Sequence, residues 1–154
     1  MSLLLLKSCP LFFELYDAEI EKMVKYCTVY TFEEGDKVIS DGEEGDQVFV
    51  MLEGHAMVQK NMGSEIVKIQ PLKAGDVFGE MSLMGEKTRQ ADIVTTDTSF
   101  ILEIKYDQIF SLFKEEPKIF GLVLFNLSRL VSRRLAASNQ IIIGLQKELR
   151  EKSA

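Results

Sequence analysis

The chain has 154 residues, enough for one domain around a single hydrophobic core. Eighteen basic residues against 24 acidic ones give a net charge of −6, which argues against direct binding to nucleic acid, because neutralisation of phosphates dominates such affinities. The mean hydropathy is near zero and the run Leu3–Leu6 is too short to span a bilayer, so neither a membrane protein nor a disordered chain is indicated.

Two cysteines, Cys9 and Cys27, allow at most one disulfide and form no CxxC pair. Their number and spacing favour reduced thiols in a cytoplasmic protein.

The first periodic segment is 17–27. Its apolar residues follow the i, i+3, i+4, i+7 spacing of one helix face, at Ile20, Met23, Val24 and Cys27. A short amphipathic helix is predicted here, with Asp17 as its cap.

From residue 28 to 105, short runs rich in β-branched and aromatic residues alternate with glycine and acidic turns. This spacing is typical of a sandwich, jelly roll or barrel, and no parallel βαβ alternation is visible. The predicted strands are 28–33, 37–40, 47–52, 55–60, 65–70, 91–96 and 100–104.

The chain then becomes helical again. A helix is predicted at 107–113, and Glu115-Glu116-Pro117 interrupts it. Pro117 suits the first turn of a second helix. That helix runs to about Leu149 and would be about 50 Å long, longer than a domain of this size needs.

The long helix carries a 4-3-4-3 apolar spacing, formed by Leu124, Ser128, Val131, Leu135, Ser138, Ile142, Leu145 and Leu149. Ile141 and Ile143 widen the apolar face. One interpretation is a helix lying on its own β-domain, which we expect for the first half. For the second half the spacing favours the seam of a parallel homodimer.

The sequence lacks the residues that several enzyme classes require. His55 is the only histidine, so a His-rich metal site is impossible, and a Ser-His-Asp triad would have to use a residue beside Gly54 in a predicted turn. The sequence has no P-loop, dinucleotide fingerprint or HExxH motif. We therefore expect no catalytic residues, no metal site and no cofactor.

The segment 78–91 has the chemistry of an anion site. Gly79 allows close approach of the backbone to a ligand, and residues 80–83 suit one helical turn with free N–H groups. Arg89 supplies a permanent charge with a planar donor fork, while Glu80 suits a sugar hydroxyl. This set fits a nucleotide whose phosphate is folded against its ribose. The alternative is that Glu80 and Arg89 form only a surface ion pair.

Two stretches resemble the signatures of the cyclic-nucleotide-binding domain superfamily. The first is Val38-Ile39-Ser40-Asp41-Gly42-Glu43-Glu44-Gly45-Asp46-Gln47-Val48-Phe49-Val50-Met51-Leu52-Glu53-Gly54. The second, similar to the phosphate-binding cassette, is Phe78-Gly79-Glu80-Met81-Ser82-Leu83 followed by Arg89-Gln90-Ala91-Asp92-Ile93. The resemblance covers nearly the whole chain, 1–154, and implies an α+β fold. An antiparallel, jelly-roll-like β-roll at about 28–105 would be flanked by a short N-terminal helix and by C-terminal helices at about 106–150.

The resemblance implies a role for each matching residue. Gly79 and Ser82 would offer backbone amides around the ribose phosphate, beside Phe78 and Met81. Glu80 would accept the ribose 2′-OH. Arg89 would bind the equatorial phosphate oxygen, with the amides of Gln90 and Ala91 close by. The interval from Glu80 to Arg89 is that of kinase regulatory subunits.

Two positions depart from the kinase-type cassette. Thr88 stands where proline is usual, and Gln90 stands where Ala, Ser or Thr is commoner. A Thr at the second position is associated with cGMP, so its absence favours cAMP over cGMP as the ligand. Gln90 can itself donate to or accept from a base or phosphate.

Residues 127–139 resemble the dimerisation helix of the catabolite activator family, where a Thr-Ser pair contacts adenine from both subunits. Ser138-Asn139 stands in its place and is expected to bind the ligand. The alternative is that Ser138 is only a tolerated small polar residue in a coiled coil.

The resemblance implies a non-catalytic, cytoplasmic sensor that binds cAMP or cGMP and signals by rearranging its C-terminal helix. Its partners would be a second copy of the chain and a downstream protein effector, with no membrane and no direct nucleic-acid contact. After Lys147-Glu148-Leu149-Arg150-Glu151-Lys152 the chain ends at Ala154, which leaves no room for a helix-turn-helix. Two alternatives stay open: the sensor half of a transcription regulator that lacks its DNA-binding domain, and a dimerisation module with a vestigial pocket.

Overall fold

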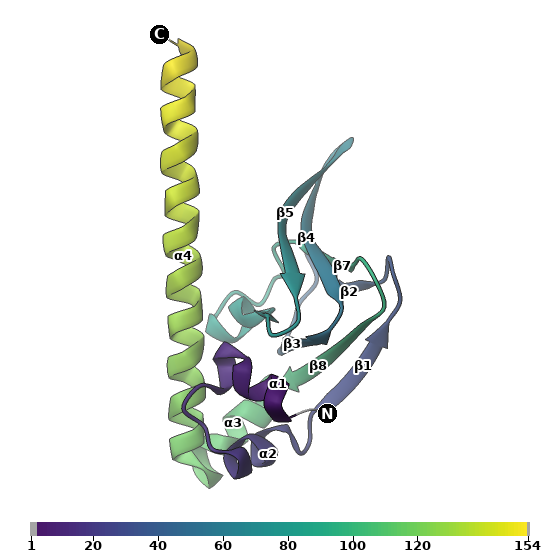
Figure 1. Cartoon of the computed structure of the whole chain (residues 1–154), viewed down its shortest axis with the longest axis vertical. Coiled ribbons are helices and arrows are strands. Elements are labelled where there is room, and N and C mark those ends of the chain that lie inside the picture. Colours follow the sequence, from purple (N-terminus) through teal and green to yellow (C-terminus); the bar gives the residue numbers. More distant parts are fainter. Residues whose placement is uncertain (1–2, 154) are drawn as a thin grey trace.

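The computed structural model describes residues 3–153 and has a β-roll beside a layer of helices (Figure 1). The helices are α1 (Leu3–Ser8), the 3-10 turn η1 (Pro10–Phe12), α2 (Asp17–Val24), the 3-10 turn η2 (Glu80–Met84), α3 (Tyr106–Glu115) and α4 (Pro117–Ser153). The strands are β1 (Thr28–Phe32), β2 (Lys37–Ile39), β3 (Gln47–Glu53), β4 (His55–Met62), β5 (Glu65–Lys73), β6 (Val77–Phe78), β7 (Asp92–Thr95) and β8 (Ser99–Lys105). The predicted α+β class, with an antiparallel roll between helices, is confirmed.

The strands form two four-stranded antiparallel sheets, in the orders β1-β8-β3-β6 and β2-β7-β4-β5. Strand β3 is buried on both faces. Val48 and Val50 pack into the core shared with the helices, whereas Phe49 and Met51 pack into the core inside the roll. Side chains alternate in direction along a strand, so one apolar strand serves both cores. This shared strand joins the roll to the helical layer.

One local prediction differs from the structure, and two elements of the structure were not predicted. Asp17 is the first residue of α2 and not its cap; the Tyr16 N–H donates instead to the Glu19 carboxylate at 2.8 Å. The run Leu3–Leu6 lies in α1, with Leu6 fully buried. Strand β6 was not predicted, since two residues between a glycine turn and Gly79 carry no periodic pattern.

The first half of α4 packs on its own domain, chiefly against η1 and α3. Ile119, Val123 and Leu127 are fully buried there. Asn126 is also buried, and its Nδ2 donates to the carbonyl oxygens of Leu11 at 3.1 Å and Phe13 at 2.8 Å. These bonds satisfy two carbonyls of the N-terminal segment and fix that segment on the helix.

The second half of α4 extends well past the domain, to the top of Figure 1. Its large apolar side chains are exposed at Leu135, Ile141, Ile142, Ile143, Leu145 and Leu149. Across residues 3–153, no helix has the length and apolar character needed to cross a membrane.

Candidate functional site

A cavity of about 200 Å³ opens between the β-roll and α4. Eight residues predicted for the ligand line it, namely Phe78, Gly79, Glu80, Met81, Ser82, Arg89, Gln90 and Ala91. Arg134 of α4 lines it as well. The structure therefore brings the two ends of the segment 78–91 into one site.

The loop begins with a glycine that the geometry requires. Strand β6 ends at Phe78, and Gly79 follows with φ +75°, the left-handed region that favours glycine. A Cβ at Gly79 would lie 2.9 Å from Nη1 of Arg89 and 3.2 Å from the carbonyl oxygen of Gln47. The turn η2 then starts at Glu80, as the predicted helical turn of residues 80–83 anticipated.

Arg89 is buried, with an exposed fraction of 6%, and every hydrogen bond of its guanidinium goes to a neutral acceptor. Its Nη1 donates to the Gly79 carbonyl at 2.9 Å and to Ser82 Oγ at 3.2 Å. Its Nη2 donates to the Gln47 carbonyl at 3.0 Å and to Gln47 Oε1 at 3.1 Å. Burial lowers the pKa of Arg89, opposed by the more distant carboxylates of Glu43, Asp46 and Glu80. Arg89 thus brings a positive charge to the cavity that no residue of 3–153 matches with an ion pair.

Glu80 is also buried, with an exposed fraction of 4%, but its charge is matched. Its Oε1 accepts from Nη1 of Arg134, whose Nη2 donates to the Val77 carbonyl. The alternative of a Glu80–Arg89 surface ion pair is therefore excluded, since both residues are buried and each has other partners. The carboxylate lines the cavity, and its second oxygen accepts no hydrogen bond within residues 3–153.

Sequence reasoning missed Arg134. A signal was present, because Arg134 lies four residues before Ser138 and so on the same helix face. Ser138 and Asn139 themselves are exposed on α4, farther from the domain, and are not among the residues that line the cavity. Their contact with a ligand stays a prediction.

Residues 42–45 of the first signature contact Arg89 of the second signature directly. The Arg89 N–H donates to the Glu43 carbonyl at 2.8 Å, and the Arg89 carbonyl accepts from the Gly42 N–H at 2.9 Å. Gly45 approaches so closely that a Cβ there would lie 2.1–2.3 Å from the guanidinium of Arg89. The first signature thus positions the arginine of the second.

Charged residues fix the end of the loop to the sheet. Lys60 Nζ donates to the Gln90 carbonyl and to Asp41 Oδ1, both at 2.9 Å. Asp92 accepts from the Asp41 N–H at 2.8 Å and from Lys37 at 3.1 Å. These bonds, led by that of the Asp41 amide, hold the pKa of Asp92 below its usual value.

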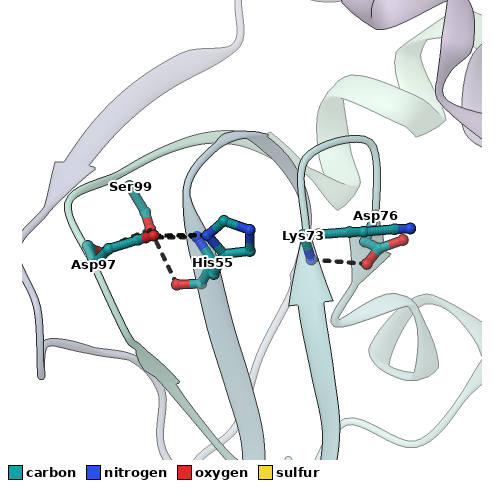
Figure 2. Close-up of polar contacts among 5 residues, drawn as sticks. All are labelled: His55, Lys73, Asp76, Asp97 and Ser99. Carbon is teal, nitrogen blue, oxygen red and sulfur yellow. Dashed lines mark hydrogen bonds and ion pairs between the residues drawn. The ribbon is translucent and has the colours of Figure 1, made fainter.

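His55, Asp97 and Ser99 lie together, but not as a catalytic triad (Figure 2). His55 Nδ1 lies 2.6 Å from Asp97 Oδ2, while Ser99 Oγ donates to the aspartate and to carbonyl oxygens and not to the histidine ring. Ser99 is fully buried, so its hydroxyl is closed to a substrate. The same figure shows the Lys73 N–H donating to Asp76 Oδ2. Both groups stabilise turns between strands.

Residues 3–153 contain no cluster of three His, Cys, Asp or Glu side chains arranged for a metal ion. Cys9 and Cys27 are both free thiols, and burial raises the pKa of Cys9 to about 11 and that of Cys27 to about 12. Neither thiol lines the cavity.

The family model described as "Cyclic nucleotide-binding domain" matches residues 29–116, which include all of the roll except its first residue and the whole segment 78–91. The chain belongs to the cyclic nucleotide-binding domain family. The resemblance inferred from the two signatures is therefore confirmed.

The chain is similar to segments of several kinds of protein. The cyclic AMP receptor protein of Thermus thermophilus is 26% identical over 160 residues, which cover 95% of this chain and 72% of that protein. Glutaminase 1 of Bradyrhizobium diazoefficiens is 28% identical over 130 residues, covering 84% of this chain. The chain spans only about a fifth of the length of that glutaminase. A solved cyclic nucleotide-binding domain from Methylobacillus flagellatus has 25% identity and a TM-score of 0.82, and the match covers 92% of this chain and 80% of that one.

Proposed function

We propose that this cyclic nucleotide-binding domain is a non-catalytic sensor that prefers cAMP to cGMP and signals through its long helix. The single observation that carries the proposal is the buried guanidinium of Arg89, which lines the cavity and has only neutral hydrogen-bond partners. A buried charge without a counter-ion is unfavourable, and a phosphate monoanion supplies one. The cavity is therefore suited to an anionic ligand.

The neighbouring groups suit the rest of a ribose cyclic phosphate. Gly79 and the turn η2 present backbone near Arg89, and the second carboxylate oxygen of Glu80 is an acceptor for a ribose hydroxyl. Glu43, Asp46 and Glu80 attract the charge of Arg89 from a distance, but none of them forms an ion pair with it. One cation beside one acceptor is the pattern that a sugar with a folded phosphate requires.

Binding without turnover fits the residues around the cavity. No histidine, cysteine or lysine is among the residues that line it. Two carboxylates line it: Glu86 is exposed, and Glu80 is buried in its ion pair with Arg134. The preference for cAMP rests on Gln90, which stands where a threonine is associated with cGMP.

The ion pair of Arg134 with Glu80 supplies the link between ligand and helix. A ribose hydroxyl that binds Glu80 changes the environment of this ion pair, and so favours one position of α4 over another. The exposed apolar stripe beyond Leu135 is the proposed seam of a parallel homodimer, with Ser138 and Asn139 on the same segment. A downstream protein would then respond to the helix pair.

Calorimetry with cAMP and with cGMP on the wild-type chain and on Arg89→Ala tests the proposal. We expect the wild type to bind cAMP more tightly, and the variant to lose about 1.5–3 kcal/mol, which is roughly 10- to 150-fold in Kd. Arg133→Ala is the matched control, because Arg133 is an exposed arginine of α4 that does not line the cavity. No binding of either nucleotide to the wild type, or equal affinity in Arg89→Ala, refutes the sensor and favours a module with a vestigial pocket.

A further inference from the structure

One cross-strand row of side chains forms the wall of the cavity on the second sheet. Ile39 pairs with Ile93, Ile93 with Val58, and Val58 with Gln70, so the row crosses β2, β7, β4 and β5 in their order within the sheet. Residues directly opposite each other in a sheet project from the same face. All four residues line the cavity.

The row is aliphatic except at its end. Ile39 and Ile93 are buried and Val58 is partly buried, whereas Gln70 lies on the edge strand β5 and is exposed. The side-chain amide of Gln70 forms no hydrogen bond within residues 3–153, whereas the amide of Gln90 donates to the Thr88 carbonyl at 3.1 Å. Gln70 is thus the one polar side chain of this row, and both its amide oxygen and its amide nitrogen are free to bind a ligand.

A flat base fits such a wall. Aliphatic side chains pack against the face of a purine ring, while an amide at the end of the row meets polar atoms on the ring edge. The amide has one acceptor oxygen and two donor hydrogens, the combination that reads adenine in pairs of hydrogen bonds. Because the phosphate is assigned to Arg89 in another wall, the row is free to take the base.

Resting on the proposed function, we infer that Gln70 contacts the edge of the nucleotide base and contributes, together with position 90, to the preference between adenine and guanine. Adenine offers a donor beside an acceptor, which matches an amide. Guanine offers two adjacent donors on its N1 and N2 edge, which match a carboxylate better. The identity of residue 70 therefore changes the ratio of the two affinities.

The test compares the Kd values of cAMP and cGMP by calorimetry for Gln70→Leu, Gln70→Glu and the wild type. Gln70→Leu removes both hydrogen bonds and brings the two affinities closer by about fivefold. Gln70→Glu shifts the ratio toward cGMP by about tenfold, although the added negative charge weakens both nucleotides. Gln59→Leu is the matched control, since Gln59 lies on the adjacent strand β4 and does not line the cavity, and its ratio stays that of the wild type.

Ratios that agree with the wild type within about twofold in both Gln70 variants overturn the inference. If Arg89→Ala still weakens binding by about 10- to 150-fold in that case, the proposed function stands and only the role of Gln70 fails. If the wild type binds neither nucleotide, both fail together. Gln70 is exposed, so both variants are expected to fold, and thermal melting monitored by circular dichroism checks this.

Discussion

Arg134 of the long helix forms an ion pair with Glu80 at the start of the turn η2, although 54 residues separate them in the chain. The same guanidinium also donates to the carbonyl of Val77, so one side chain binds both ends of the short segment that carries Phe78 and Gly79. The helix therefore contacts the ligand loop directly. Any ligand that binds Glu80 acts on this contact.

Removing the arginine of this pair should destabilise the domain. Arg134→Met keeps most of the aliphatic stem but leaves Glu80 buried and charged, and we expect a loss of about 1–3 kcal/mol in the free energy of unfolding. The value is below that of a fully buried pair because the Arg134 side chain is 30% exposed. Urea unfolding followed by circular dichroism measures it.

The control for this change is a double variant. Glu80→Gln combined with Arg134→Met removes the unmatched charge, and should be more stable than Arg134→Met alone. If the double variant is less stable than the single one, Glu80 does not depend on Arg134 for its charge balance.

A methyl group at Gly45 should weaken both nucleotide binding and the fold. The new Cβ of Gly45→Ala would lie 2.1–2.3 Å from the guanidinium of Arg89, so the guanidinium must move away from its four acceptor contacts. We expect a loss of about tenfold or more in cAMP affinity, with about 1–3 kcal/mol of destabilisation. Calorimetry and urea unfolding on the same variant separate the two effects.

Gly144→Ala is the matched glycine control. Nothing lies within 4 Å of a Cβ at Gly144, which is inside α4, so the change should leave cAMP affinity unchanged and stabilise the helix by about 0.5–1 kcal/mol. Wild-type affinity in Gly45→Ala would mean that the position of Arg89 does not determine binding.

A charge on the apolar stripe of α4 should separate the proposed dimer. Ile142→Glu puts a carboxylate in the centre of the seam, where pairing would bury it beside its copy, so we expect a monomer in sedimentation velocity. Gln146→Glu adds the same charge at an exposed position beside the seam and should leave the dimer intact. A wild-type chain that sediments as a monomer would refute the seam.

The pH dependence of stability should reveal the network around Asp92. Its pKa is lowered in the folded chain, chiefly by the Asp41 N–H and then by Lys37, so near the pKa of an ordinary carboxyl the unfolded chain binds more protons than the folded one. The stabilisation is therefore complete above about pH 5 and is lost as the pH falls below about 4. Asp92→Asn should flatten this part of the curve in urea unfolding from pH 2.5 to 6.

Glu65→Gln serves as the comparison, because it removes an exposed carboxylate that forms no ion pair within residues 3–153. Its curve should keep the slope of the wild type. Parallel curves for Asp92→Asn and the wild type would show that Asp92 contributes nothing to acid sensitivity.

Strand prediction succeeded where a single apolar run between two turns defines a strand. The segments 28–33, 47–52 and 100–104 match β1, β3 and β8 closely, since β-branched and aromatic residues bounded by glycine turns leave few other options. Strand β5 is longer than its prediction and includes Pro71, which reads as a break. Strand β5 is an edge strand, where proline is tolerated although it lacks an N–H. The residues of a strand do not by themselves show where that strand lies within its sheet.

The sequence by itself determined the loop 78–91, because its glycine, carboxylate and arginine are spaced within one short segment whose chemistry can be read locally. Eight of the ten predicted site residues line the cavity for this reason. Only the tertiary structure decided the partners of those residues: Gln47 and Gly79 for Arg89, and Arg134 for Glu80. These contacts join segments separated by 10 to 54 residues, and they depend on how the sheets close and where α4 crosses them. A local sequence pattern contains no information about contacts between such distant segments. It therefore predicts which side chains form a site, but not which residues pair with their charges.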